Sequence, residues 1–416
     1  MRKVLLIAYH YPPEPAAGAR RPGFLARYLP EFGWDATVLT RPLPLRSGKR
    51  DDVEQPGIIA APLPGASLGK RVRSAIVADN GSAPSPQPST MRWFLRRARE
   101  TLMFPDNAAP WLPGAIAAGV RACDAIGFDA VISTAMPATV HLAGAAISRL
   151  RKLPWIADYR DLWYGNPYCR HGRLRVRVER DLERRVLRRA RRVTTISEAL
   201  ARRLEVLLER PAAVIPNGFD PREWADVEGS TPDTFELCYT GSLYDGSRTP
   251  KLLFEALAAL KREGDAAAGA RIDFFGPNSD HVDELAERFG VTSQVQRHGV
   301  VARDLALAAQ RAASHLLIFA SEDPSTFDEL GSKVYEYAGA RRPMLVFGPR
   351  ESALRPYVMR HELGWYASDV DEAKAALREA YGRFAAGDRE LHVAPGTVLD
   401  ARDLARSFAA ELDALF

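Results

Sequence analysis

The sequence predicts an α/β protein made of two doubly wound domains, each a parallel sheet with helices on both faces. Short apolar, β-branched runs alternate with longer helical patterns along the whole chain, which is typical of buried parallel strands. This alternation starts twice, on either side of a proline-rich stretch. The 416 residues, of which 46% are hydrophobic and 26% charged, are too many for one compact core and suit two domains of about 200 residues.

Thirteen strands are expected, seven in the first half of the chain and six in the second. Those of the first half are Lys3–Tyr9, Asp35–Thr40, Gly57–Leu63, Asp129–Thr134, Pro154–Tyr159, Arg192–Ile196 and Ala213–Ile215. Those of the second half are Phe235–Thr240, Arg271–Gly276, Val295–Val300, His315–Ala320, Met344–Gly348 and Leu363–Ala367.

The domain boundaries follow from a break in this rhythm. Pro216–Pro232 contains Asn217-Gly218 and three prolines, which interrupt helices and strands alike, so we expect a hinge there. Residues 1–215 would then form an N-terminal domain and residues 233–395 a C-terminal domain, both Rossmann-like. Residues 396–416 would form a helix, for which the N-terminal domain is a candidate packing surface. Because ligands of such sheets bind beyond the carboxyl ends of the strands, two domains facing each other would make a cleft.

The composition argues against several classes of protein. Cys123, Cys169 and Cys238 lie far apart, with no CxxC pair and no histidine spaced for zinc, so neither a disulfide scaffold nor a metal site is expected. No stretch approaches the eighteen or so apolar residues of a spanning helix, and Val4–Tyr9 is too short for the core of a signal peptide. We therefore expect a cytoplasmic protein.

The net charge of +5 is unevenly distributed. Arg170–Arg192 holds eleven arginines against three acids, which suits nucleic acid, an anionic membrane or a phosphorylated substrate, or simply a solvated helix face with intrahelical ion pairs. Ala78–Thr90 has little to bury and is expected to be a mobile loop. Met91–Phe104 mixes arginines with Trp93 and Phe94, as an interfacial membrane helix does, but an ordinary surface helix with one buried face has the same pattern.

The stretch 326–345 carries the clearest functional signal. Asp328 and Glu336 are eight positions apart, with a turn at Gly331-Ser332 and a helix expected from about Ser332 to Ala340. Asp328 would lie in the loop and Glu336 about one turn into the helix, so both can face a ligand at the helix N-terminus. Such an end attracts phosphate, and carboxylates beside it suit sugar or ribose hydroxyls. The alternative is a solvated helix acid and a capping residue.

Two loops in the first half also follow predicted strands. The loop from Tyr9 to Pro22 has small residues around Gly18 and leads into a helix, which can bring backbone amides to a phosphate. It lacks the GxGxxG fingerprint, so a nicotinamide or flavin cofactor is not indicated. Asp158, Arg160 and Asp161 surround the end of another strand, where they either face a ligand or lock the loop as paired charges.

The second half opens in a similar way. Gly241-Ser242 follows a strand, and Arg248 and Lys251 precede the helix expected over Leu252–Leu260. A Gly-Ser turn followed by two cations at a helix start is suited to clamp a diphosphate.

Together these motifs resemble the retaining GT-B glycosyltransferases of family 4, especially the bacterial branch that builds surface polysaccharides. The resemblance extends over almost the whole chain and rests on six motifs in the same order. They are the Tyr-Pro-Pro-Glu loop with Gly18, Phe104-Pro105-Asp106 with Trp111, Asp158–Trp163, Glu183-Arg184-Arg185 through Ile196-Ser197-Glu198, Val214–Asp220, and Lys333–Tyr337.

The resemblance implies a role for each matching position. Glu336 would hold the ribose hydroxyls of a nucleoside diphosphate sugar, and Asp328 would contact the donor sugar, with a shorter reach than the family's Glu. Arg248 and Lys251 lie near the family's diphosphate clamp, although Ser242 stands where the family usually has Arg. The donor-binding residues implied are Gly18, Gly241, Ser242, Arg248, Lys251, Ser332, Lys333 and Glu336. The family's histidine near the donor sugar is replaced by Arg160 and Asp161, so the catalytic candidates are Arg160, Asp161 and Asp328. Acceptor-binding candidates are Glu14, Arg21, Asp158 and Trp163.

The implied reaction is transfer of a sugar, with retention of configuration, from a nucleoside diphosphate sugar to a hydroxyl of a sugar or lipid-linked acceptor. Neither a metal nor another cofactor is implied, and nucleic acid is not an expected partner. The setting would be polysaccharide or glycolipid assembly, with peripheral binding to an anionic surface at the inner face of the plasma membrane. Two alternatives are a non-catalytic sugar-nucleotide-binding subunit and a GT-B sugar-nucleotide epimerase, for which His10, His141 and His298 would be acid–base candidates.

Overall fold

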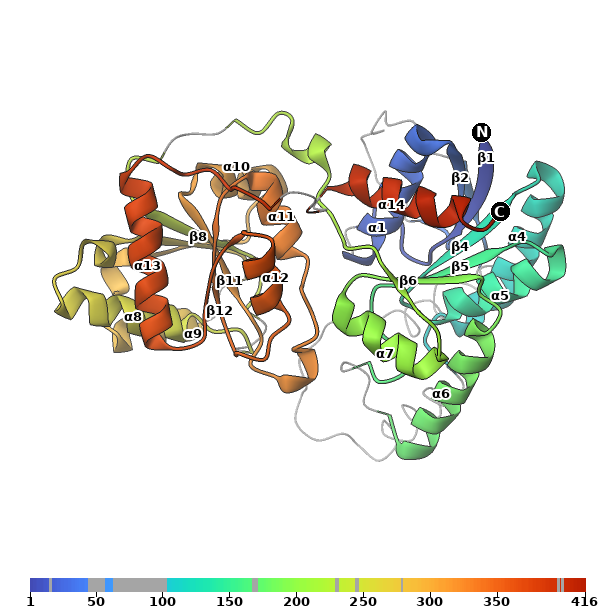
Figure 1. Ribbon diagram of the computed structural model, residues 1–416, viewed down its shortest axis with the longest axis horizontal. Helices are drawn as coiled ribbons and strands as arrows, with labels where there is room; N and C mark the ends of the chain where they lie inside the picture. Colours follow the sequence, from blue (N-terminus) through green and yellow to red (C-terminus); the bar gives the residue numbers. More distant parts are fainter. Residues whose placement is uncertain are drawn as a thin grey trace, which may run out of the picture. The chain divides into compact units, whose positions relative to one another are not determined.

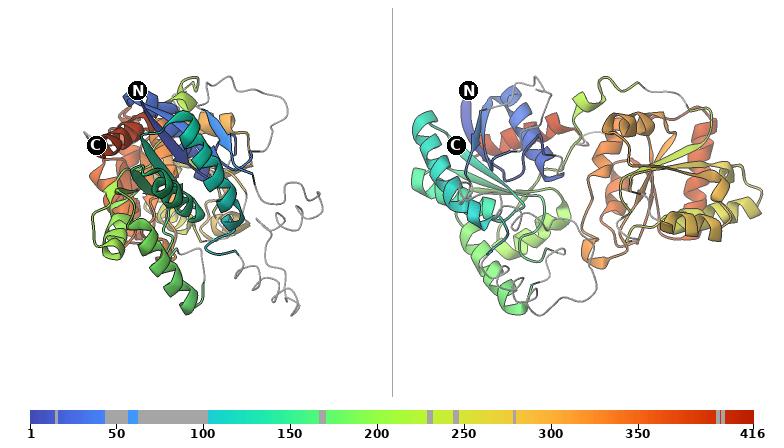
Figure 2. Two further views of the ribbon diagram at one scale, coloured as in Figure 1. Left: turned by 90° about the vertical axis from the view of Figure 1, so that its right-hand side faces the viewer. Right: turned by 180° about the vertical axis from the view of Figure 1, so that it is seen from behind.

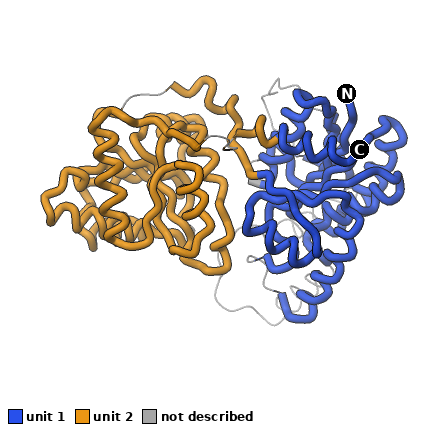
Figure 3. The backbone as a smooth tube through the Cα atoms, viewed as in Figure 1, with its two compact units in different colours: residues 1–215, 405–416 blue, residues 216–404 orange. Residues whose placement is uncertain are grey.

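The computed structural model of the chain is shown in Figure 1. It describes residues 1–14, 17–43, 57–62, 103–166, 171–228, 232–243, 247–277, 280–394, 397 and 400–416. The chain divides into two compact units (Figure 3). Unit 1 comprises Met1–Ile215 and Ala405–Phe416, and unit 2 comprises Pro216–Leu404. Ala78–Thr90 and most of Met91–Phe104, including Trp93 and Phe94, lie outside the described residues.

Unit 1 is built on a seven-stranded sheet with the order β3-β2-β1-β4-β5-β6-β7, whose strands all pair in parallel. The strands are β1 (Arg2–Ile7), β2 (Trp34–Thr40), β3 (Ile58–Ala60), β4 (Ala130–Ala135), β5 (Trp155–Tyr159), β6 (Arg192–Thr195) and β7 (Ala213–Val214). The helices are α1 (Ala17–Tyr28), α4 (Leu112–Ile126), α5 (Thr139–Arg151), α6 (Arg173–Leu187), α7 (Glu198–Leu208) and α14 (Ala401–Asp413).

Helices cover both faces of this sheet (Figures 1 and 2). Helices α4 to α7 contribute to one hydrophobic cluster, and α1 and α14 lie on the other side, where the guanidinium of Arg21 stacks 5.2 Å from the ring of Phe408. Every residue of β4 and β5 is buried, as expected of strands covered on both faces. The strand order reverses between β1 and β4, so the loops after these two strands mark the position where such sheets bind ligands.

Unit 2 repeats the architecture with six parallel strands in the order β10-β9-β8-β11-β12-β13. The strands are β8 (Glu236–Thr240), β9 (Arg271–Phe275), β10 (Val295–Gly299), β11 (His315–Phe319), β12 (Met344–Phe347) and β13 (Gly364–Ala367). The helices are α8 (Lys251–Arg262), α9 (Asp280–Arg288), α10 (Arg303–Ala312), α11 (Lys333–Ala340), α12 (Leu354–Arg360) and α13 (Val370–Ala385).

The core of unit 2 shows why these apolar runs form buried strands. Along β11, Leu317 and Phe319 join one hydrophobic cluster with α8, α9 and α13, whereas Leu316 and Ile318 join a second cluster with α10, α11 and α12. Successive side chains of a strand point to opposite faces, so a continuous apolar run fills both cores. The thirteen predicted strands are all present in order, which confirms the predicted α/β class.

Helix α14 belongs to unit 1 over residues 405–413, where its Phe408 and Leu412 are fully buried. Its end is tied to the first two strands, because the indole N–H of Trp34 donates to Asp413 at 3.1 Å and Arg2 lies 3.4 Å from the same carboxylate. No helix among the described residues is long and apolar enough to cross a bilayer.

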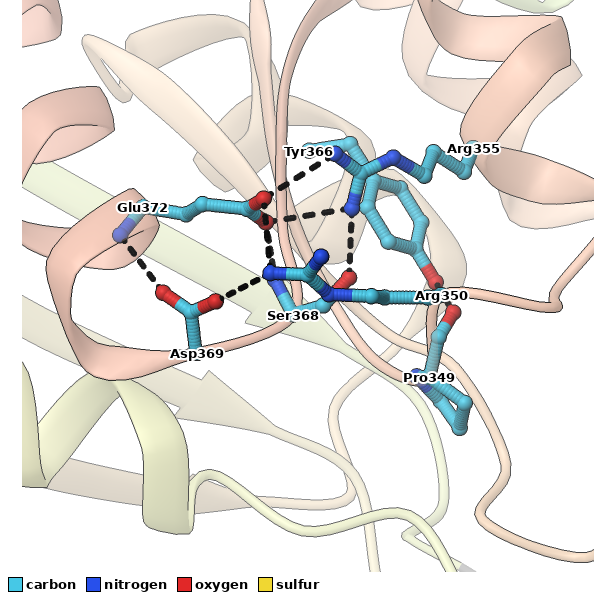
Figure 4. Close-up of polar contacts among 7 residues, drawn as sticks. All are labelled: Pro349, Arg350, Arg355, Tyr366, Ser368, Asp369 and Glu372. Atoms are coloured by element: carbon cyan, nitrogen blue, oxygen red, sulfur yellow. Dashed lines mark hydrogen bonds and ion pairs between the residues drawn. The ribbon is translucent and has the colours of Figure 1, made fainter.

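A polar cluster fixes the last two strands of unit 2 at their carboxyl ends (Figure 4). Asp369 caps α13 by accepting the N–H of Glu372 at 2.9 Å, and Glu372 in turn accepts the N–H of Ser368 at 2.8 Å. Both oxygens of Glu372 also accept from Arg355 at 3.1 Å, and Arg350 pairs with Asp369 at 2.5 Å. These contacts bind the loop after β12 to the start of α13 (Figure 4).

Candidate functional site

Thr240, the last residue of β8, anchors the loops around the switch point of unit 2. Its N–H donates to the hydroxyl of Tyr337 at 3.0 Å, and its Oγ1 accepts from Nε2 of Gln310 at 2.8 Å. Its carbonyl accepts from Nζ of Lys333. Helices α10 and α11 are therefore tied to the end of the first strand of this unit, next to β11, where the strand order reverses.

Gly241 lets the chain leave β8 close to Lys333. It has a φ of +128°, which disfavours other residues, and a Cβ at this position would overlap the Lys333 ammonium. Its N–H donates to the carbonyl of Phe275 at 2.6 Å, and the next carbonyl, that of Ser242, accepts from the hydroxyl of Tyr239 at 2.8 Å. The Gly-Ser turn expected from the sequence is thus held against the neighbouring strand β9.

Lys333 is the first residue of α11, and its side chain is partly buried. Burial lowers the pKa of Lys333 to about 8, and the positive charge of Arg248 acts in the same direction, whereas Glu336 opposes the shift. Its ammonium lies 5.0 Å from the centre of the Tyr239 ring. A partly buried cation at a helix N-terminus is suited to neutralise an anionic ligand.

Glu336 lies one turn into α11, as predicted, with 16% of its side chain exposed. Its Oε1 accepts from Nε2 of Gln310 at 2.8 Å, and its Oε2 accepts from Nη1 of Arg303 at 3.0 Å. Arg303 also pairs with Glu223 at 2.5 Å. The carboxylate is therefore held on both oxygens by α10 while it stays within reach of solvent.

The other residues predicted to bind the sugar donor differ in how far their side chains are buried. Asp328 is half-buried in the loop before α11, and Ser332, at the N-cap of α11, is exposed and makes no capping bond with its side chain. Arg248 is half-buried in the loop before α8, with its N–H bonded to the carbonyl of Leu243 at 3.2 Å. Lys251 is exposed at the start of α8. The structure thus brings Gly241, Ser242, Arg248, Lys333 and Glu336 to the end of one strand.

In unit 1, Arg160 binds backbone carbonyls from two loops. Its Nε donates to Ala135 at 2.7 Å, its Nη2 to Met136 at 2.8 Å and its Nη1 to Gly18 at 2.6 Å. A Cβ on Gly18 would lie 2.8 Å from Nη1, so the glycine permits this close approach. Arg160 therefore holds the start of α1 against the loop after β4, and the next residue, Asp161, is exposed.

Arg21 and Asp158 were predicted to bind the acceptor, but the structure buries both side chains. They form a two-bond pair at 3.0 Å inside the core, where Asp158 is 0% and Arg21 2% exposed. Thr134 and Thr194 each donate to the same carboxylate at 2.8 Å. Burial alone would raise the pKa of Asp158, but Arg21 and these hydroxyls lower it below its usual value. Both side chains lock α1 to β5, so they are not accessible to an acceptor.

Glu14 and Trp163 are placed differently from that pair. Oε1 of Glu14 contacts Nδ1 of His10 at 2.9 Å and Nη2 of Arg41 at 2.8 Å, at the switch point beyond β1. Oε2 of Glu14 is buried and has no hydrogen-bond partner within the described residues. Glu14 therefore stays a candidate for binding a ligand.

Trp163 is 4% exposed and lines a cavity of about 170 Å³ within unit 1. Its indole N–H also lacks a hydrogen-bond partner in the part of the chain that the structure describes, so Trp163 likewise stays a candidate for binding a ligand. Met136, Ala138 and Arg175 are among the other residues that line the cavity.

Two of the three histidines considered for an epimerase, His141 and His298, have structural surroundings, whereas His10 lies beside Glu14. His141 is fully buried, bonds Ser133 at 2.8 Å, and has a pKa lowered to about 3 because of its burial. His298 bonds Asp273 at 2.6 Å and stacks on Phe275 at 4.2 Å.

A comparison with protein families finds a similarity in the first half of the chain. Residues 18–218 match the family described as "Glycosyl transferase 4-like domain". This stretch of unit 1 is therefore similar to a glycosyl transferase 4-like domain. The matched stretch contains Gly18, Arg160, Asp161 and Trp163, whereas Lys333 and Glu336 lie beyond it. A search of curated protein sequences finds no significant relative.

Solved structures share the fold of the whole chain. Sucrose-phosphate synthase from Thermosynechococcus elongatus has a TM-score of 0.59 at 14% identity, covering 100% of this chain and 98% of its own. HepE from Anabaena, in complex with UDP and glucose, has a TM-score of 0.56 at 13% identity, covering 100% of both chains. A putative UDP-N-acetylglucosamine 2-epimerase from Listeria monocytogenes has a TM-score of 0.53 at 12% identity, covering 100% and 96%. These similarities confirm the predicted GT-B fold, and a fold alone does not choose between transferase and epimerase.

Four residues that position the site in unit 2 were not predicted from the sequence: Thr240, Arg303, Gln310 and Tyr337. One signal was available for Gln310. It lies three positions after Leu307 on the buried side of α10, so it is a polar residue in an otherwise apolar stripe.

Proposed function

We propose that the protein is a glycosyltransferase that moves a sugar, with retention of configuration, from a nucleoside diphosphate sugar to a hydroxyl of an acceptor. The proposal is carried by one observation, the meeting of Lys333, Glu336 and Gly241 at the switch point of unit 2. It combines a cation for phosphate with a held carboxylate for hydroxyls on the first turn of one helix, and Gly241 leaves the space that the lysine occupies.

The departing diphosphate is the group whose charge the site must stabilise. Lys333, with Arg248 and the exposed Lys251, supplies positive charge, and the first N–H groups of α11 point in the same direction as its helix dipole. Ser332 and Gly241 are proposed as further residues of the site that binds the nucleoside diphosphate sugar. The backbone N–H of Gly18 is proposed as a hydrogen-bond donor to the diphosphate. Glu336 accepts the hydroxyls of the nucleoside ribose.

The acceptor side belongs to the glycosyl transferase 4-like domain. Glu14 and Trp163 are its proposed contacts, because each has a buried polar atom with no partner among the described residues. Retention would follow from a front-face reaction, in which a diphosphate oxygen takes the proton of the acceptor hydroxyl. Asp161 and Asp328 are the proposed groups near the reacting centre, and Arg160 acts by holding the start of α1, at Gly18, against the loop that carries Met136.

We further propose a role in polysaccharide or glycolipid assembly at an anionic membrane surface. Helix α6 exposes Leu174, 77% accessible, and Val178, 48% accessible, among arginines that include Arg173 and Arg177. Apolar side chains flanked by arginines suit the headgroup region of a bilayer.

The decisive test is release of nucleoside diphosphate from uridine, guanosine and thymidine diphosphate sugars by the purified protein. A transferase releases the diphosphate slowly without acceptor, whereas an epimerase converts the sugar without releasing it. A binding subunit shifts the melting temperature with a ligand but releases nothing. Absence of release with every donor, with or without candidate acceptors, would contradict the proposal.

A further inference from the structure

The Glu336 carboxylate is held on both oxygens by side chains of one helix, α10. Gln310 donates to Oε1 at 2.8 Å and Arg303 donates to Oε2 at 3.0 Å, and both donors belong to α10. Gln310 is 1% exposed, and Arg303 is itself anchored by Glu223 at 2.5 Å. Two bonds from opposite ends of one helix fix the plane of the carboxylate, not only its position.

The orientation of Gln310 follows from its neighbours. An ionised carboxylate only accepts hydrogen bonds, so the amide must turn its NH₂ group toward Glu336. The same Nε2 reaches Oγ1 of Thr240 at 2.8 Å. Oε1 of Gln310 is then buried without a hydrogen-bond partner in the described part of the chain. A buried acceptor without a hydrogen-bond partner lowers the stability of the fold. A glutamine at this position therefore favours a functional role for its NH₂ group, which is to hold Glu336.

A carboxylate fixed in this way is suited to a vicinal diol. It has about four acceptor positions, so the bonds to Gln310 and Arg303 are compatible with further donors, and its side chain is partly accessible. The 2′- and 3′-hydroxyls of ribose can each donate to it. A 2′-deoxyribose offers only one of these hydroxyls at a site built for two.

We propose that Arg303 and Gln310 are positioning residues that hold Glu336 in the orientation that selects ribonucleoside over 2′-deoxyribonucleoside diphosphates. This inference rests on the proposed function and deepens it by naming the class of nucleotide. The donor is then a uridine or guanosine diphosphate sugar or another ribonucleotide sugar, and not a deoxythymidine diphosphate sugar.

Titration calorimetry with UDP, 2′-deoxy-UDP, GDP and 2′-deoxy-GDP tests the proposal on the full chain. For the base that binds, wild type should prefer the ribose form by about 10- to 100-fold, as expected for one hydrogen bond to a charged group. Gln310→Met and Arg303→Met should each reduce this ratio to a few-fold or less, mainly by weakening binding of the ribose form. Their melting temperatures, measured in parallel, report whether the variants are folded.

Gln294→Met is the matched control, because Nε2 of Gln294 also bonds two acceptors, the carbonyls of Ala268 and Ala270 at 2.6 and 2.8 Å, but does not contact Glu336. Its ribose preference should equal that of wild type. A wild-type ratio near one, or an unchanged ratio in folded Gln310→Met and Arg303→Met, overturns the inference while leaving the proposed function in place if nucleotide sugars are turned over. No binding of any of the four nucleotides, together with no turnover, overturns both.

Discussion

Lys333 and Glu336 lie three positions apart on α11, so their side chains leave the same end of the helix. Glu336 is held by α10, and Lys333 is bound to the carbonyl of Thr240 at the end of β8. At the scale of single residues the proposed chemistry depends on this pair. One side chain is an acceptor for hydroxyls, and the other is a cation whose charge depends on pH near neutrality.

Binding of a nucleoside diphosphate should weaken as the pH rises through about 8, the pKa to which burial lowers Lys333. Below this pH the lysine is charged, whereas above it the ligand must bring back a proton, so affinity falls by up to about tenfold per pH unit. The ligand's own phosphate, with a pKa of about 6, stays ionised over this range. Titration of UDP from pH 7 to 9.5 measures the effect. Lys333→Arg should give a flat profile, and a flat wild-type profile would contradict this role.

Asp158→Ala should lower the free energy of unfolding by about 3–5 kcal/mol, because it leaves the buried Arg21 unpaired. Urea denaturation measures the loss. Asp124→Ala removes an exposed partner of Arg151 and should cost less than about 1 kcal/mol. If Asp158→Ala is as stable as Asp124→Ala and loses only activity, the carboxylate binds an acceptor and our structural interpretation is wrong.

The contrast between Asp158 and Glu336 shows what the sequence could predict at this scale. Both acids follow the strand–helix pattern, and position alone correctly placed Glu336 at the start of a helix. Asp158 pairs with Arg21, which is 137 positions away, and this pairing depends on how α1 packs on β5. A local pattern shows that charges gather at the end of a strand, but not whether they close on each other in the core.

At the scale of elements, the sheets were predictable because buried strands require continuous apolar runs, and all thirteen are present. The ends of the strands were less so, since the predicted Val295–Val300 ends at Gly299, where φ is positive. Gln310 was missed because the function of a helix side chain depends on the helix opposite, here α11. The local sequence of α10 shows that a polar residue interrupts its buried side, but not which helix lies opposite.

Helix α14 should contribute strongly to the stability of unit 1 through Phe408, which is fully buried and contacts Arg21. Phe408→Ala removes a large core side chain and should cost about 3–5 kcal/mol in urea denaturation. Ala410→Ser, on the exposed side of the same helix, should change stability by about 0.5 kcal/mol or less. Equal stability of the two variants would show that α14 does not pack on unit 1 as described.

Helix α6 should bind the protein to vesicles containing phosphatidylglycerol at low salt, and high salt should release it. Each basic residue near such a surface contributes about 1 kcal/mol before screening. Leu174→Ser should reduce co-sedimentation, whereas Leu305→Ser, which alters an exposed leucine of α10 in unit 2, should not. If wild type stays in the supernatant at low salt, a soluble acceptor becomes the better hypothesis.

For the molecule as a whole, the fold similarity and the family match cover different parts of the chain. The GT-B fold extends over all of the chain, but the glycosyl transferase 4-like match ends at residue 218, before any residue of the proposed donor site in unit 2. The claim that unit 2 binds a nucleoside diphosphate sugar therefore depends on the side chains at the end of β8. Glu336 is the residue on which it depends most.

Release of nucleoside diphosphate by Glu336→Ala, compared with wild type on the best nucleotide sugar, tests that claim most directly. Glu287→Ala, which alters an exposed glutamate of α9, is the matched control, and melting temperatures show whether each variant is folded. Loss of a charged hydrogen bond and of the ribose position should reduce turnover by Glu336→Ala by about two orders of magnitude, with Glu287→Ala unchanged. Wild-type turnover in a folded Glu336→Ala protein would contradict the account.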